Sequence, residues 1–145
     1  MKKILVAVDG SDNSNKALIK AKELATAFNS EITLIYVTED VNTLDSIYLF
    51  DKNKVNTDPL NNAFKNQAME VLDGAMEYFK DYNGKVDTLI KKGNAPFKIL
   101  EVSEKAGYDL IVIGSRGLGP FSRQIMGSVS NKVVNNSKIS VLIVK

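Results

Sequence analysis

The chain has 145 residues, enough for one domain with a substantial core, and its 44% apolar and 25% charged residues are ordinary for a globular protein. Its net charge of +2 is too small to favour a nucleic-acid-binding or membrane-surface protein. Cysteine and histidine are both absent, which excludes thiol nucleophiles, disulfides and the commonest general base. Any metal is therefore expected to be a hard cation with oxygen ligands, such as Mg²⁺ arriving with phosphate.

The N-terminal segment predicts a buried strand at 4–8, apolar at every position as in strands covered on both faces. Asp9 ends this run after five residues, too early for the core of a signal peptide, and no apolar stretch in the chain approaches the roughly 18 residues of a membrane span. We therefore expect a cytoplasmic protein with no membrane contact. Ser11 and Asp12 are alternative N-caps for a helix whose apolar period runs from 17 to 28.

A second strand is predicted at 32–37, and it is followed by a long polar segment, 38–58, without clear periodicity. Connections of this length are uncommon in compact domains and are usually functional or mobile. Tyr48 and Phe50 in it are candidates to cover a bound base, with packing on the domain's own core as the alternative. Asp58-Pro59 then opens a second helix.

The remaining chain continues the alternation of strands and helices. Strands are predicted at 85–90, 110–113 and 139–144, with helices from Pro96 to Gly107 and over 128–136. Five strands alternating with four helices predict a single doubly wound α/β domain over residues 1–145, with a five-stranded parallel sheet.

A glycine-rich loop follows the fourth strand and carries the clearest chemical signal. In open parallel sheets, ligands bind beyond the carboxyl ends of the strands. Glycines at 114, 117 and 127 let backbone N–H groups approach an anion closely. The helix that begins at Ser128 directs its unpaired N–H groups and positive dipole end toward the same place. The loop is therefore predicted to bind phosphate.

This loop matches neither of the two commonest phosphate-binding motifs. It lacks the Gly-Lys-Ser/Thr of a Walker A loop, and the first strand–helix turn holds one glycine instead of the dinucleotide fingerprint. Its spacing is G-x2-G-x9-G-S. Together with the runs 4–11, 109–117 and 141–144, this motif resembles the universal stress protein family, in particular its ATP-binding branch, which has an adenine-nucleotide α-hydrolase-like fold.

The resemblance implies the strand order 3-2-1-4-5, an ATP site with Mg²⁺, and adenine against the backbone of Val8 and Val37. Asp9 would face the ribose or a phosphate-bound Mg²⁺. The resemblance further places the ribose and phosphates against residues of the glycine loop and the following helix, which donate backbone N–H groups and hydroxyls: Gly114, Ser115, Gly117, Gly127, Ser128, Val129 and Ser130.

Several of these residues also have a purely structural interpretation. Asp9 fits a tight turn, and Ser128 fits a helix N-cap. Arg116 and Arg123 are candidate phosphate contacts because of their charge, but arginines are also common on surfaces. These alternatives remain open at the level of sequence.

The implied function is that of an ATP-dependent stress-response regulator or sensor. The alternative is a slow ATPase or nucleotidyl-transfer enzyme, although nothing in the sequence pairs Asp9 with an arginine to position water at a γ-phosphate. A phospho-receiver would need an aspartate where the third strand ends in Lys91-Lys92. A flavin carrier would place its phosphate loop after the first strand, where only Gly10 occurs.

The fifth strand also suggests how the chain assembles. In the implied order it lies at an edge of the sheet, yet Ile139 to Val144 is almost entirely apolar. Such a composition is unfavourable for an exposed edge, and pairing with a second copy would cover it with two-fold symmetry. We expect a homodimer through this strand, with an adenine nucleotide as ligand and no nucleic-acid partner.

Overall fold

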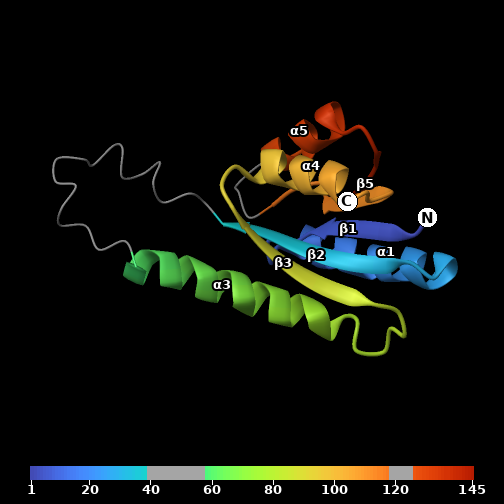
Figure 1. Ribbon diagram of the computed structural model, residues 1–145, viewed down its shortest axis with the longest axis horizontal. Coiled ribbons are helices and arrows are strands. Elements are labelled where there is room, and N and C mark those ends of the chain that lie inside the picture. The colour runs from blue at the N-terminus through green and yellow to red at the C-terminus, as the bar shows by residue number, and fades with distance from the viewer. Residues whose placement is uncertain (39–57, 118–125) are drawn as a thin grey trace.

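The computed structural model describes residues 1–38, 58–117 and 126–145, and these contain the predicted alternation of strands and helices (Figure 1). The elements are, in chain order, β1 Lys3–Ala7, α1 Asp12–Phe28, β2 Glu31–Thr38, α3 Asp58–Glu77, β3 Val86–Lys92, α4 Ala95–Lys105, β4 Leu110–Gly114, α5 Ser128–Asn136 and β5 Ser140–Val144. Most bounds differ from the predicted ones by one or two residues. The segment predicted as a long connection, together with Tyr48, Phe50 and Arg123, falls largely or wholly outside the described residues.

All five strands are parallel and have the order β3-β2-β1-β4-β5. The central strand β1 pairs with β2 on one side, where Ala7 lies opposite Ile35, and with β4 on the other, where Val6 lies opposite Val112. The predicted fold class and strand order are confirmed.

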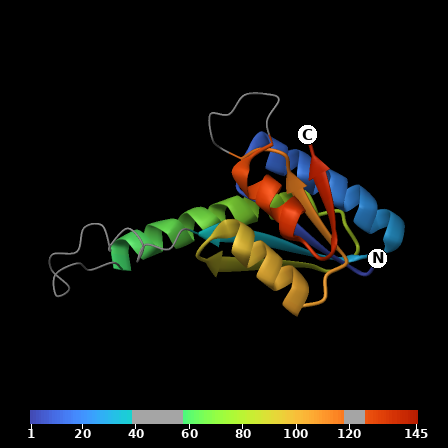
Figure 2. The same ribbon diagram turned by 90° about the horizontal axis from the view of Figure 1, so that it is seen from above.

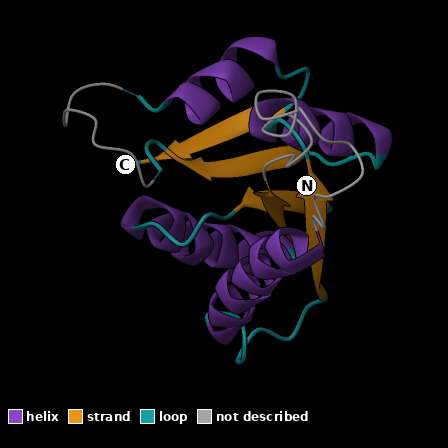
Figure 3. Ribbon diagram, turned by 90° about the vertical axis from the view of Figure 1, so that its left-hand side faces the viewer, coloured by secondary structure: helices purple, strands orange, loops and turns teal. Residues whose placement is uncertain are grey.

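The sheet is the middle of three layers, with α1 and α3 on one face and α4 and α5 on the other (Figure 3). Side chains of β1 alternate between the two cores. Ile4 and Val6 belong to the core under α1 and α3, whereas Leu5 and Ala7 belong to the core under α4 and α5. Burial on both faces explains why this strand is a continuous apolar run.

The two helices that follow β1 and β4 begin differently. Ser11 is the N-cap of α1, and its hydroxyl accepts a hydrogen bond from the N–H of Ser14, which settles the choice between Ser11 and Asp12. The N-cap of α5 is Gly127, which makes no side-chain bond to the first turn. The interpretation of Ser128 as an N-cap is therefore wrong, because Ser128 is the first residue inside the helix.

The helix α3 begins beyond the carboxyl ends of β2 and β3 and runs back along the sheet (Figure 2). Its buried residues Leu72 and Ala75 join the core that it shares with α1. Within the described ranges, none of the helices combines the length and the apolar character that crossing a bilayer requires.

Candidate functional site

A cavity of about 280 Å³ opens at the carboxyl ends of the central strands. It lies between β1 and β4, where the chain reverses its winding: α1 leaves on one face of the sheet and α5 lies on the other, so a crevice forms between them. The strand order alone therefore marks this crevice as the candidate binding site.

Most of the predicted site residues meet in this cavity, although they come from four separate segments. The predicted residues that line it are Val8, Asp9, Val37, Gly114, Arg116, Gly117, Gly127, Ser128, Val129 and Ser130. The lining residues that were not predicted are Ala7, Ser14, Ile35, Tyr36, Ala95, Ile99 and Ile113.

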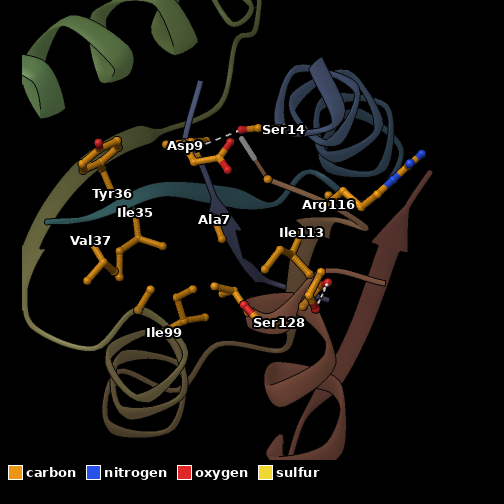
Figure 4. Close-up of a pocket in the computed structure, with 17 residues that line it drawn as sticks. Ala7, Asp9, Ser14, Ile35, Tyr36, Val37, Ile99, Ile113, Arg116 and Ser128 are labelled. Carbon is orange, nitrogen blue, oxygen red and sulfur yellow. Dashed lines mark hydrogen bonds between the residues drawn. The ribbon is translucent and has the colours of Figure 1, made fainter. Parts of the chain in front are cut away.

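One side of the cavity is apolar. Val37 and Ile35 from β2 face Ile99 from α4 across it (Figure 4). Ala95, the first residue of α4, also lines the cavity. Ile99 is almost fully buried at 3% exposure. A slot between aliphatic side chains suits a flat, weakly polar group such as a nucleobase.

Asp9 lies on the opposite side, next to Ser14 (Figure 4). Its Oδ1 accepts the N–H of Ser11 at 2.9 Å, and its own N–H donates to the hydroxyl of Ser14 at 3.2 Å. The other oxygen, Oδ2, faces Gly117, where an added Cβ would lie only 2.6 Å from it. Asp9 is therefore a turn residue that still presents one carboxylate oxygen to the cavity.

The N-termini of α1 and α5 both contribute residues to this cavity, and they differ in how their backbone donors are used. At α1, the chain itself supplies acceptors, the Ser11 hydroxyl and the Asp9 carboxylate. At α5, Gly127 has no side chain to accept from the first turn, and Ser128, Val129 and Ser130 line the cavity. The first N–H groups of a helix have no partner within it, so the start of α5 is the end of the cavity whose chemistry suits an anion.

The hydroxyl of Ser130 bonds to the protein itself. It donates to the carbonyl of Ser115 at 2.9 Å or to that of Gly127 at 3.0 Å, and the side chain is buried. Since a hydroxyl has one proton, Ser130 in this arrangement offers a ligand its backbone N–H rather than its hydroxyl.

Packing requires glycine at one motif position, Gly114, and leaves little space for a side chain at another, Gly127. A Cβ on Gly114 would lie 2.8 Å from the backbone carbonyl carbon of Asn13, at the start of α1. A Cβ on Gly127 would lie 3.3 Å from the Cα of Arg116. The sequence motif thus combines glycines that let backbone segments meet with a glycine, Gly117, that makes room for Asp9.

Ser115 is the predicted ligand residue that the structure places behind the cavity wall. It is 6% exposed, and its N–H donates to the carbonyl of Val144 at 2.7 Å. Its carbonyl accepts the N–H of Gly127 at 2.7 Å, and its hydroxyl accepts from the side-chain amide of Asn13 at 3.2 Å. Ser115 therefore connects β5, α1 and the start of α5.

Arg116 borders the cavity, but its side chain extends away from the centre, past the start of α1 (Figure 4). Asp9 is the one carboxylate among the described residues of the lining, and no group of three or more potential metal ligands occurs in the described parts of the chain. A cation held here would depend on oxygen ligands from a bound molecule as well as from Asp9.

Comparison with known proteins agrees with this architecture. The model of the universal stress protein family matches residues 1–145. The universal stress protein YxiE of Bacillus subtilis is 33% identical, with 99% of this chain and 98% of YxiE covered.

Among solved structures, that of MJ0577, a protein of Methanocaldococcus jannaschii, superimposes with a TM-score of 0.83 at 28% identity and covers 99% of this chain and 95% of its own. A universal stress protein of Archaeoglobus fulgidus in complex with dAMP has the same fold, with a TM-score of 0.70 at 20% identity, covering 100% of this chain and 98% of its own. The chain belongs to the universal stress protein family.

Proposed function

We propose that this universal stress protein binds ATP in the cavity and acts as a nucleotide-dependent regulator or sensor in the stress response. The observation that carries the proposal is the start of α5: a helix N-terminus capped by Gly127 lines the same cavity as an apolar slot. An apolar slot suits a base, and a helix N-terminus suits a phosphate. A nucleotide combines both parts in one molecule.

The base would lie in the slot between Val37 and Ile99. Backbone groups at Val8 and Val37 would recognise its edge, as the predicted site requires. The dAMP held by the Archaeoglobus fulgidus relative is an adenine nucleotide bound by a protein of this fold, and it supports adenine as the base.

The phosphates would lie against the first turn of α5 and beside Gly117. Hydrogen bonds to charged groups contribute about 1.5–3 kcal/mol each, and a micromolar dissociation constant needs about 8 kcal/mol after association costs. Four or five backbone donors are enough to reach that range. Binding without a cluster of lysines is therefore physically reasonable.

Asp9 fits a role toward Mg²⁺ carried by the phosphates. Its Oδ2 points toward Gly117 and the cavity, and Mg²⁺ commonly takes one or two carboxylates together with phosphate oxygens and water. The ion would neutralise part of the ATP charge in a cavity whose described lining holds one carboxylate and one guanidinium. We propose binding rather than turnover. Asp9 is the one carboxylate among the described lining residues, and if it binds Mg²⁺, no second carboxylate of that lining is left to activate water.

We also propose that the chain forms a homodimer through β5. The edge at β3 carries charges, including a Lys85–Asp87 ion pair at 2.8 Å, and charged edges discourage pairing with another sheet. The edge at β5 is apolar and only half-buried at Val141 and Ile143. A second copy of β5 would cover it.

Thermal unfolding with and without Mg-ATP tests the nucleotide proposal. At about a thousand times the dissociation constant, ATP should stabilise the protein by roughly 4 kcal/mol. Gly127→Glu should abolish this gain, because its side chain would enter the crowded space between Arg116 and Ser115 and place a negative charge at the start of α5.

Gly74→Glu is the matched control, because a Cβ at Gly74 on the exposed side of α3 would meet nothing within 4 Å. This variant should keep the full gain with Mg-ATP. The proposal fails if wild-type protein gains nothing, or if Gly127→Glu and Gly74→Glu gain equally.

A further inference from the structure

The cavity is assembled from two halves that belong to different strand–helix units. Val8, Asp9 and Ser14 come from β1 and the start of α1, whereas Gly117 and the first turn of α5 come from the unit built on β4. A nucleotide that touches Asp9 and the α5 donors at once needs these halves at a fixed separation. Hydrogen-bonding geometry tolerates only a few tenths of an ångström.

Asn13, in the first turn of α1, reaches from one half to the other. Its side-chain amide donates to the hydroxyl of Ser115 at 3.2 Å, a bond between residues 102 positions apart in the chain. Its backbone also packs directly against Gly114. Asn13 is not among the residues that line the cavity.

Ser115 passes this restraint on to the anion-binding end. Its carbonyl holds the N–H of Gly127 at 2.7 Å and the hydroxyl of Ser130 at 2.9 Å, which lie before and within the first turn of α5. A shift of Ser115 would therefore move the donors of that turn. Among the described residues, no hydrogen bond connects Val37 or Ile99 in the apolar slot to these bonds of Ser115.

We infer that Asn13 is a positioning residue of the nucleotide site, which acts through Ser115 to hold the phosphate-binding turn of α5 in register with Asp9. The inference rests on the proposed function. A general role in folding would lower the affinity for every ligand of the site. A positioning role predicts that loss of the Asn13 side chain weakens binding of the phosphates and leaves binding of the base unchanged.

Calorimetric titration of Asn13→Ala with Mg-ATP and with adenosine tests this. Loss of one hydrogen bond that orders the phosphate-binding turn should weaken ATP binding about three- to tenfold, while adenosine affinity stays within about twofold of wild type. Asn15→Ala is the matched control: Asn15 is also half-buried on α1, and its side chain makes no hydrogen bond to the described residues. It should change neither affinity.

Ser115→Ala provides a second route, because it removes the acceptor of the same bond. It should reproduce the selective loss, and the double variant Asn13→Ala/Ser115→Ala should lose no more than either single variant. If wild type binds ATP but Asn13→Ala does not change its affinity, or loses ATP and adenosine equally, the inference is overturned. If wild type binds neither, the proposed function fails first, and the positioning role falls with it.

Discussion

Single residues decide which of the two helix N-termini at the cavity is open to an anion. In dinucleotide-binding folds the phosphate lies at the helix after the first strand. Here Asp9 and Ser11 already supply acceptors at that helix, so a phosphate there would meet a carboxylate. Gly127 leaves the first turn of α5 without a side-chain acceptor. The position of the glycine motif after β4 instead of β1 agrees with this difference.

A carboxylate far from the cavity fixes the start of the sheet, and its contribution depends on pH. The backbone N–H groups of Lys3 and Lys2 donate to Asp109 and hold the pKa of that carboxyl below its ordinary value of 3.8. A pKa lowered by folding gives stability that is present above the ordinary pKa and is lost as the pH falls through the folded-state pKa. Asp109→Asn should therefore lower Tm at pH 7, with a difference from wild type that narrows below about pH 3.8.

Thermal scans at pH 7 and pH 3 measure this difference. Asp73→Asn is the control, because Asp73 is exposed on α3 and makes no hydrogen bond or ion pair to the described residues. It should change Tm little at either pH. A gap for Asp109→Asn that stays constant from pH 7 to pH 3 would show that the carboxylate's charge does not matter.

At the level of elements, periodicity and turn residues were sufficient to predict every strand and helix of the described fold. The run at 4–8 is apolar because β1 is buried on both faces, and the glycine spacing marks the loop after β4. The contribution of α4 to the cavity could not be predicted, because Ala95 and Ile99 reach the cavity only through the way α4 packs on the face of the sheet. The contact between Asn13 and Ser115 likewise joins distant parts of the sequence and leaves no local pattern.

The edge strand β5 carries the dimer prediction. The carbonyl of Val144 accepts from the N–H of Ser115, the residue directly after β4. Because successive residues of a strand alternate in direction, the N–H of Val141 points outward. Val141→Pro removes this donor without removing a bond to β4. Wild type should sediment with the mass of two chains at micromolar concentration, and Val141→Pro should sediment as a monomer.

Thr88→Pro is the matched control on the opposite edge. The carbonyl of Lys85 accepts from Ile32 on β2, so by the same alternation the N–H of Thr88 points away from the sheet. This variant should remain dimeric. A monomeric wild type, or a dimer lost equally in both variants, would refute assembly through β5.

For the whole molecule, the doubly wound topology and the chemistry of the cavity point to the same function. The reversal between β1 and β4 opens a crevice at the carboxyl ends of the strands. The side facing α4 is apolar, and the side facing α5 is formed by the first turn of that helix, whose N–H groups have no partner within the helix. A protein built in this way can bind a nucleotide by its backbone with few charged side chains, which suits occupancy-dependent signalling.

The central claim is that phosphate binds to the first turn of α5. The most direct measurement is a two-dimensional ¹H–¹⁵N NMR titration of wild-type protein with Mg-ATP and, separately, with adenosine. The account predicts that the amide signals of Gly127, Ser128, Val129 and Ser130 shift with ATP and remain nearly unchanged with adenosine. Shifts confined to the start of α1, or no shifts at residues 127–130 with saturating ATP, would contradict it.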